Sequence, residues 1–317
     1  MGADMQLSDR IGRRLKLQDL HILMTVVQAG SMGKAAERLN TGQPNISRSI
    51  ADLEHAFGVR LLERHQQGIE PTQCGRALLD CGAAVFDELR RGVKDIEFLA
   101  DPTVGEVRIG SNPLLAASFV SAVVDRLSRR YPRIVFHIMT AQYETLHRDL
   151  SERNVDLLIA RRFGPITDER LDFEFLFDDS YVVATGAQNP WVRRRKLTLA
   201  DLVDQPWVLP REGMTKLATS EAFRASGLGN PRTTVFTNAP GVRTRLLTTG
   251  RYFTIFSASS LKFPTRRSEI KVLPIDLPSA SAAIGIVTLK GRTLSSVAQL
   301  FVKGARDLAK PSAKTDW

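Results

Sequence analysis

Amide and guanidinium side chains gather in a short polar segment that runs from Gln43 to Ser49. Arg48 can hold the O6 and N7 atoms of a guanine with two hydrogen bonds, or it can clamp a phosphate. The side-chain amides of Gln43 and Asn45 suit adenine edges or the DNA backbone. A solvated polar helix face is the alternative interpretation of the same residue types. The helices that hold this segment decide whether it contacts DNA or is simply a solvated face.

Two short helical patterns surround this polar segment. Apolar residues recur at helical spacing in both patterns, at Met32, Ala35, Ala36 and Leu39 in the first and at Ile46, Ile50, Leu53 and Phe57 in the second. Only Asn40–Gln43 separates them, and two amphipathic helices joined so tightly must cross steeply. This arrangement indicates a helix-turn-helix, whose second helix is built to enter the major groove of DNA.

Cap and turn residues set the limits of the elements around this motif. Ser31 is a good N-cap for the helix that follows it, and Gly58 is a typical C-terminal stop for the next one. A preceding helix is expected over Leu17–Ala29. Two short extended segments, Val59–Arg64 and Ile69–Thr72, flank a polar turn with a glycine, and they predict the hairpin wing of a winged helix.

The charge balance is basic, but it does not locate a binding surface. The chain has 317 residues, a net charge of +10 and a pI of about 9.9, which suits a polyanionic partner. Residues 1–100 nevertheless hold 13 Lys and Arg against 13 Asp and Glu. The whole excess of positive charge therefore lies in residues 101–317, and only the motif indicates where DNA would bind.

Composition narrows the class of protein. A content of 43% hydrophobic and 25% charged residues is that of an ordinary globular chain. No run of about 18 uncharged apolar residues occurs, and the basic N-terminus has no apolar core behind it, so we expect neither a membrane span nor a secretory signal and infer a cytoplasmic protein. No cofactor or metal site is expected.

Cys74 and Cys81 are too few for a zinc site or a disulfide framework. On one helix they would lie about 10 Å apart, too far for a bridge. We expect two small residues on a buried helix face, with a redox switch as the alternative.

A long amphipathic helix is predicted from an N-cap at Thr72 to about Ala100. Its apolar positions alternate in steps of four and three, as in a coiled coil, at Leu78, Gly82, Val85, Leu89, Gly92, Ile96 and Leu99. A helix about 40 Å long with one apolar stripe is poorly stable alone. We expect it to dimerise through Leu78, Val85, Leu89 and Ile96; packing on its own C-terminal domain is the alternative.

Strand and helix patterns alternate after Asp101-Pro102, which predicts an α/β sheet covered on both faces. Strands are expected at Glu106–Gly110, Ile134–Met139, Val155–Ala160, Tyr181–Thr185, Trp207–Leu209, Thr234–Thr237, Tyr252–Phe256, Lys271–Ile275 and Ala283–Thr288. Helices are expected at Leu114–Arg130, Tyr143–Arg153, Thr215–Ser226, Gly241–Thr249 and Ser295–Leu308.

Open α/β sheets bind ligands at the loops that follow the carboxyl ends of strands. The residues at these positions here are Ser111, Asn112, Thr140, Gln142, Arg161, Arg162, Pro210, Arg211 and Asn238. Together they predict a site for a carboxylate or a polyhydroxylated metabolite, and the basic balance of this part of the chain favours an anion. Turn formation or surface contact is the alternative for each of them.

The residues around these motifs resemble those of the LysR-type transcriptional regulators. The N-terminal match comprises Ala35-Ala36-Glu37-Arg38-Leu39, Gln43-Pro44, Ile46-Ser47-Arg48, Ile50, Leu53-Glu54, Gly58-Val59-Arg60-Leu61-Leu62-Glu63-Arg64, Gly68, Pro71-Thr72 and Gly75. The C-terminal match comprises Gly105 to Gly110, Arg129-Arg130-Tyr131-Pro132, Asp156-Leu157-Leu158-Ile159 and Leu176-Phe177. Gly42 departs from the family, which usually has Ser there. Glycine caps a helix nearly as well, but one possible phosphate-contacting hydroxyl is absent.

The resemblance implies a winged helix-turn-helix over residues 1–71, a dimerising linker helix over 72–101 and an effector-binding domain over 102–317. The expected fold class is therefore α/β with an α-rich N-terminal winged helix-turn-helix and two C-terminal lobes like those of periplasmic solute-binding proteins. Lobe I would comprise about 104–177 and 275–310, and lobe II about 178–274, with the effector between them. A homodimer or homotetramer on double-stranded promoter DNA is implied.

The residues expected to contact DNA lie on the two helices and the wing: Ser31, Lys34, Gln43, Pro44, Asn45, Ser47, Arg48, Ser49, Arg64 and Gln66. For Ser31, a pure capping role is equally compatible with the sequence. The predicted function is a ligand-responsive transcription regulator. A solute-binding or sensory module without DNA activity is the alternative, and it leaves residues 17–72 without a role. No dinucleotide, phosphate-loop, nucleophile-elbow or paired-histidine motif occurs, so we expect no enzyme.

Overall fold

The computed structural model describes residues 15–65, 68–162, 168–262, 269–277 and 282–310. The chain forms two units, Met1–Gly92 and Val93–Trp317.

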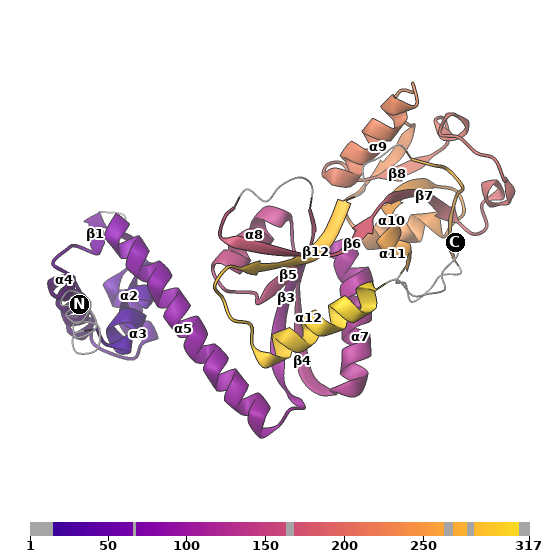
Figure 1. Cartoon of the computed structure of the whole chain (residues 1–317). Helices are drawn as coiled ribbons and strands as arrows, with labels where there is room; N and C mark the ends of the chain where they lie inside the picture. Colours follow the sequence, from indigo (N-terminus) through magenta and orange to yellow (C-terminus); the bar gives the residue numbers. More distant parts are fainter. Residues whose placement is uncertain (1–14, 66–67, 163–167, 263–268, 278–281, 311–317) are drawn as a thin grey trace. The chain divides into compact units, whose positions relative to one another are not determined.

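The first unit is a small helical domain with a two-stranded hairpin (Figure 1). Its elements are α2 (Leu17–Ala29), α3 (Met32–Arg38), α4 (Gln43–Phe57), β1 (Leu62–His65) and β2 (Gly68–Pro71). Gly30 and Gly58 follow α2 and α4 with left-handed φ values of 71° and 69°, which a glycine adopts without strain. The predicted first helix, helix-turn-helix and hairpin are confirmed.

The core of this unit joins its three helices to the start of the wing. The buried side chains at its centre are Leu23, Val26, Ala35, Ile46, Ile50, Leu53 and Leu61. The helical spacing of Ile46, Ile50 and Leu53 brings all three to one side of α4, as the sequence predicts. Phe57 was expected on the same side, but it is 45% exposed because it is the last residue of the helix.

Helix α5 (Gln73–Ala100) is the predicted long helix. Its first part packs through glycines: a Cβ at Gly82 would lie 3.1 Å from Leu20 Cγ and 3.2 Å from Met24 Sδ on α2. Cys74 and Cys81 are exposed, so the expectation of a buried face was wrong for them. Each cysteine comes one residue before a buried glycine, Gly75 or Gly82, and successive residues of a helix point about 100° apart.

Lobe I of the second unit is a five-stranded sheet in the order β4-β3-β5-β12-β6. Its strands are β3 (Val104–Ser111), β4 (Arg133–Thr140), β5 (Leu157–Arg162), β6 (Leu171–Asp179) and β12 (Ala282–Leu289). Strands β4 and β5 run parallel to β3, whereas β12 runs antiparallel to both β5 and β6. The carboxyl ends of the three parallel strands therefore share one edge of the sheet.

Helices cover both faces of this sheet. They are α6 (Pro113–Leu115), the π-helical segment η1 (Ala116–Val120), α7 (Ser121–Arg130), α8 (Tyr143–Ser151) and α12 (Ser296–Ala309). Helices α7 and α12 lie side by side on one face, where Phe119 and Phe301 are buried in the core (Figure 1). Helix α8 buries Leu146 and Leu150 on the other face. The predicted single helix Leu114–Arg130 thus contains a π-helical turn.

Lobe II is a second five-stranded sheet in the order β11-β7-β10-β8-β9. Its strands are β7 (Tyr181–Gly186), β8 (Trp207–Leu209), β9 (Thr233–Phe236), β10 (Phe253–Ser257) and β11 (Ile270–Val272). Its helices are η2 (Pro190–Arg193), η3 (Ala200–Leu202), α9 (Met214–Ala225), α10 (Pro240–Leu247) and α11 (Ala258–Lys262). Strands β8, β9 and β10 are parallel, so their carboxyl ends also share an edge. Trp207 and Phe223 lie at the centre of the core.

The chain passes from the first sheet to the second at Ser180, between β6 and β7, and returns between β11 and β12. Every strand predicted after Asp101 is present, although β11 ends three residues before the predicted Ile275. Strand β6 and helix α11 were not predicted.

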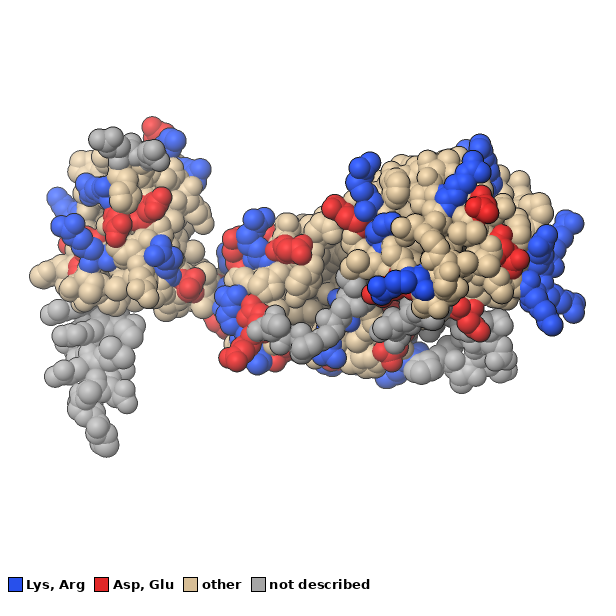
Figure 2. All heavy atoms as spheres, turned by 90° about the horizontal axis from the view of Figure 1, so that it is seen from above, with Lys and Arg blue, Asp and Glu red and all other residues tan. Residues whose placement is uncertain are grey.

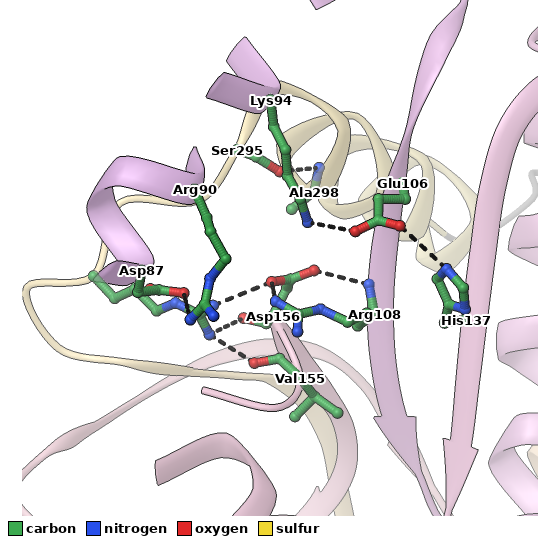
Figure 3. A network of polar contacts seen from close by, with 11 residues as sticks. Asp87, Arg90, Lys94, Glu106, Arg108, His137, Val155, Asp156, Ser295 and Ala298 are labelled. Atoms are coloured by element: carbon green, nitrogen blue, oxygen red, sulfur yellow. Dashed lines mark hydrogen bonds and ion pairs between the residues drawn. The ribbon is translucent and has the colours of Figure 1, made fainter. Parts of the chain in front are cut away.

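The last residues of α5 belong to the second unit and are bound to lobe I. Lys94 Nζ lies 3.0 Å from Glu106 Oε1 on β3, and His137 on β4 meets the other carboxylate oxygen at 3.4 Å (Figure 3). Asp95 Oδ1 accepts hydrogen bonds from the backbone nitrogen and hydroxyl of Ser296 at 2.9 and 3.0 Å. Phe98 packs against the core of lobe I. The end of the long helix is therefore fixed to the sheet.

Candidate functional site

The turn between α3 and α4 sets the direction of the second helix. Asn40 adopts a left-handed conformation with φ 49°, and Thr41 donates its backbone N–H to the Ala36 carbonyl at 3.0 Å. Gly42 is the N-cap of α4 and offers no side-chain hydrogen bond. Asn45 donates from Nδ2 to Thr41 Oγ1 at 3.1 Å, so the hydroxyl before Gly42 ties the first turn of the helix to the loop.

Polar side chains cover the side of α4 that faces away from the core. Gln43, Pro44, Asn45 and Arg48 are exposed, and Ser47 and Ser49 are half-buried. Within the described part of the chain Arg48 has no hydrogen bond or ion pair. Its guanidinium is thus available to a partner outside the chain, and the structure brings the predicted polar residues of α4 onto one surface.

Two predicted residues lie at the start of α3. The Ser31 hydroxyl accepts a hydrogen bond from the Lys34 backbone nitrogen at 3.2 Å, which is the capping role. Lys34 itself is exposed. The amino end of α3 therefore presents a cation together with the positive end of a short helix dipole, a combination that favours phosphate.

The wing is hydrogen-bonded to α4 and to the turn between α2 and α3. Glu54 Oε1 on α4 accepts backbone hydrogen bonds from Leu61 and Leu62 at 2.8 and 3.3 Å. On the other strand, Ile69 donates its backbone N–H to the Gly30 carbonyl at 3.1 Å. The sequence reasoning assigned Glu54 no role, and the structure shows that it sets the distance between wing and α4.

Two predicted contacts belong to this hairpin. Arg64 is exposed on β1, with Nη2 3.6 Å from the sulfur of Met32. Gln66 lies outside the described residues.

Charge alone does not mark this surface. Figure 2 shows one face of the molecule, on which the Lys and Arg side chains of the first unit are interspersed with Asp and Glu. This mixture agrees with the absence of net charge in residues 1–100. Any preference for DNA must therefore come from how individual side chains are placed, rather than from a large basic patch.

The apolar stripe of α5 emerges from the protein toward the helix end. Leu78 packs against the core of the first unit, and Val85 is half-buried. Leu89, Ile96 and Leu99 are 47, 68 and 79% exposed. The structure thus divides the four predicted dimer residues: Leu78 contacts its own chain, Val85 is half-buried, and Leu89 and Ile96 present apolar surface to solvent.

The candidate effector residues of lobe I differ in whether their polar atoms form hydrogen bonds within the chain or face solvent. Ser111 is fully buried and donates its hydroxyl to the Ile159 carbonyl at 2.8 Å. Asn112 Oδ1 caps α6 by accepting two backbone hydrogen bonds at 3.0 Å. Thr140 and Gln142 are exposed. The first two residues shape the edge of the sheet, and the last two offer polar atoms to solvent.

The two arginines that end β5 point to different surroundings. Arg161 forms an ion pair with Asp179 and lies 4.8 Å from the ring centroid of Tyr181. Arg162 is exposed and lies 4.4 Å from the ring centroid of Phe173.

The candidate residues of lobe II lie together at the ends of β8 and β9. Pro210 is buried, and Arg211 and Asn238 are exposed. The Arg211 backbone nitrogen donates to Asn238 Oδ1 at 3.2 Å, which joins the two loops. The guanidinium of Arg211 lies 5.9 Å from the ring centroid of Phe236. This edge therefore carries a cation and an amide that solvent can reach.

Asp179 joins the two lobes where the chain crosses between them. Its carboxylate is 2% exposed and accepts hydrogen bonds from the backbone nitrogen and hydroxyl of Ser259 on α11, at 2.9 and 2.6 Å. The same carboxylate pairs with Arg161 of lobe I. A residue of the crossing segment thus holds one group from each lobe.

Comparison with known proteins accounts for both parts of this arrangement. The profile of the "Bacterial regulatory helix-turn-helix protein, lysR family" matches residues 17–76, and that of the "LysR substrate binding domain" matches residues 100–310. The chain belongs to the LysR family of transcriptional regulators. It is a regulator with a helix-turn-helix DNA-binding domain and an effector-binding domain, as the resemblance predicted.

Relatives in this LysR family are distant in sequence but similar in length. The chain is 25% identical to the uncharacterized HTH-type transcriptional regulator YdcI of Escherichia coli (strain K12), over 95% of this chain and 98% of that protein. It is also 25% identical to the HTH-type transcriptional regulator GbpR of Azospirillum brasilense, over 96% and 92%.

Solved structures support the fold. Full-length OxyR from Pseudomonas aeruginosa superposes with a TM-score of 0.63 at 19% identity, covering 92% of this chain and 95% of that chain. Full-length CbnR in complex with its target DNA superposes with a TM-score of 0.52 at 21% identity, covering 93% and 100%. At this identity the likeness extends to the fold alone.

One residue at the effector-domain edge of this LysR-family chain was missed. Arg243 on α10 is 3% exposed, although sequence reasoning treats a charged residue in a short helix as solvated. Its only sequence signal is its place three residues after Pro240, in the first turn of a helix that follows β9.

None of the described helices is long and apolar enough to cross a membrane.

Proposed function

We propose that α4 enters the major groove of promoter DNA with the side formed by Gln43, Pro44, Asn45, Ser47, Arg48 and Ser49. The observation that carries this proposal is the exposed Arg48, which has no partner in the described chain and lies opposite the buried Ile46, Ile50 and Leu53. Ser31, Lys34, Arg64 and Gln66 contact the flanking phosphates. The hydrogen bonds of Glu54 keep the wing at a fixed distance from α4.

The effector binds between the two lobes in this proposal. Thr140 and Gln142 of lobe I and Arg211 and Asn238 of lobe II offer exposed polar groups at sheet edges formed by the carboxyl ends of parallel strands. Ser111, Asn112, Arg161 and Pro210 shape those edges from inside. Binding shifts the population between arrangements of the lobes, and the spacing of the DNA-binding domains changes with it.

Two copies of the chain pair through α5 in this proposal, and two such pairs form a tetramer. The exposed stripe that begins at Leu89 is the support, because apolar surface of this kind gains stability when a second helix covers it. Replacing Val85 and Leu89 together with Asp should reduce the oligomer to smaller species in sedimentation velocity. An unchanged sedimentation profile would remove α5 from the interface.

DNA recognition is tested by footprinting on the region upstream of the protein's own gene. Arg48→Ala should weaken binding about 10- to 100-fold, because one bidentate arginine–guanine contact contributes about 1–3 kcal/mol. If Arg48 instead contacts a phosphate, the substitution should weaken binding to all DNA sequences alike. It should also reduce the slope of log affinity against log salt concentration by about one.

Arg129→Ala is the matched control. It removes the same charge from the second unit, where Arg129 is exposed and pairs with Asp125 four residues earlier. We expect wild-type footprints from this variant. If Arg48→Ala also protects DNA with wild-type affinity, α4 is not the recognition helix.

A further inference from the structure

Arg243 carries a buried guanidinium that the described residues do not fully hydrogen-bond. The residue is 3% exposed, and its Nε and Nη1 atoms have no hydrogen-bond partner among the described residues. Its guanidinium carbon lies 4.7 Å from the ring centroid of Phe256. A guanidinium carries five N–H donors, and leaving them unpaired away from water is costly, so a side chain in this state is suited to an added acceptor.

None of the described carboxylates forms an ion pair with Arg243. Burial lowers the pKa of its guanidinium to about 10, and the nearby Tyr181 opposes this shift. The group is still protonated at neutral pH, because about 10 lies well above 7. The internal segments outside the described residues, 163–167, 263–268 and 278–281, contain no Asp or Glu. The described residues thus supply no carboxylate that neutralises it.

The position of Arg243 places it where the lobes meet. Phe256 lies near the carboxyl end of β10, and the next residue, Ser257, pairs with Tyr181 at the start of β7. Arg161 of lobe I also reaches this junction, where its guanidinium carbon lies 4.8 Å from the Tyr181 ring centroid. The two arginines differ in one respect: Arg161 is paired with Asp179, whereas Arg243 has no acidic partner among the described residues.

We propose that Arg243 binds the carboxylate of a small organic acid, which is the effector; this inference rests on the proposed function, in which the effector lies between the lobes. A single unneutralised cation matches a monoanion. The planar fork of a guanidinium matches a planar carboxylate with two parallel hydrogen bonds. A phosphate dianion would bring a second negative charge into surroundings formed by Phe256, Leu247, Val208 and Ala184.

The surroundings also suit the remainder of such a molecule. The cluster around Phe256 is apolar and includes Leu114 of lobe I among its partly buried members. An organic acid with an apolar body would place its carboxylate on Arg243 and its carbon atoms against this cluster. The ligand would then contact both lobes, as an effector that changes their arrangement must.

The test is thermal unfolding of the full-length chain with acetate, butyrate, benzoate, the amide of each acid, and inorganic phosphate, all at equal ionic strength. At least one carboxylate should raise the melting temperature, and its amide and phosphate should not. Arg243→Met should weaken that carboxylate about 10- to 100-fold, and Arg243→Lys should weaken it less. Arg245→Met is the matched control, because Arg245 is exposed on the same helix, and its response should equal that of the wild type.

Arg243→Met should also melt at or above the wild-type temperature without any probe, because it removes an unpaired buried charge. A lower temperature would mean that the protein itself already stabilises the guanidinium, which contradicts the inference. Four other results would overturn the inference. They are a carboxylate-induced rise in melting temperature that is equal in Arg243→Met and wild type, a rise with the amides, a rise with phosphate alone, and no rise in the wild type with any carboxylate. Footprinting with wild-type protein separates the two proposals, because DNA protection survives if only the ligand assignment fails.

Discussion

Asp156 offers the clearest quantitative test of how lobe I is held together. Its Oδ1 atom lies 3.2 Å from Arg108 Nη2 and 3.1 Å from Arg292 Nη2, and its Oδ2 atom accepts the Arg108 backbone N–H at 2.8 Å (Figure 3). The side chains of Asp156 and Arg292 are only 10 and 3% exposed. One buried carboxylate therefore faces two guanidinium groups.

Asp156→Asn keeps the shape of this side chain and removes its charge. Breaking a buried ion pair from one side costs about 3–5 kcal/mol, because the remaining charge is left without compensation. Arg292 also donates to the Val155 carbonyl at 2.6 Å, so we expect the lower end, about 3 kcal/mol. With a urea m value of about 3 kcal/mol/M, the unfolding midpoint falls by about 1 M.

The assay is urea unfolding of the full chain followed by far-ultraviolet circular dichroism. Asp125→Asn is the matched control, because its carboxylate lies 3.0 Å from Arg129 Nη2 but the two side chains are 66 and 77% exposed. That pair should contribute little, because solvent screens it. Both substitutions change the net charge equally. Midpoints that fall by the same amount would refute the reasoning, because burial would then not determine the cost.

Two further predictions concern Gly75 and Glu106. A Cβ at Gly75 would overlap the Leu61 carbonyl. Gly75→Ala should therefore destabilise the first unit by about 1–3 kcal/mol and speed amide exchange in residues 17–76. Gly33→Ala is the control and should do neither, because its Cβ would make only an ordinary contact at 3.9 Å. Similar exchange in both variants would contradict the packing argument. The hydrogen bond from Lys94 lowers the pKa of Glu106 below its ordinary 4.5, so its contribution to stability is present above that pH and is lost as the pH falls through the lowered value. Glu106→Gln should accordingly be less stable than wild type at pH 6 in thermal unfolding, and the gap should narrow as the pH falls below 4.5; a gap that does not change with pH would exclude this carboxylate as its cause.

The sequence predicts the first unit well because its determinants are local. Ile46, Ile50 and Leu53 lie within two helical turns, and Gly58 ends the same helix. Each signal acts between residues that are neighbours along one element. The polar side of α4 could be predicted from the same pattern, because burial of the apolar side leaves the polar residues facing solvent.

Strand β6 escaped prediction because its partners are remote. Its acidic residues argue against a strand, yet Glu174 meets Arg306 of α12 at 2.5 and 2.7 Å, a contact over more than a hundred residues. The candidate site shows the same limit. Arg161 was expected to hold a ligand and is found paired with Asp179, whereas the buried Arg243 was not among the predicted site residues. Tertiary packing, rather than residue type, decides which arginine is paired within its own lobe and which is buried without an acidic partner among the described residues.

The carboxylate of Asp179 has a mechanical consequence for the two lobes. Because it is ion-paired with Arg161 of lobe I and hydrogen-bonded to Ser259 of lobe II, it would act as the pivot in the proposed movement of one lobe against the other. Atoms beside a pivot barely travel, and those farthest from it sweep the widest arc. In that movement, substitutions in loops remote from Asp179 would change the response to the effector without disturbing the contacts of Asp179.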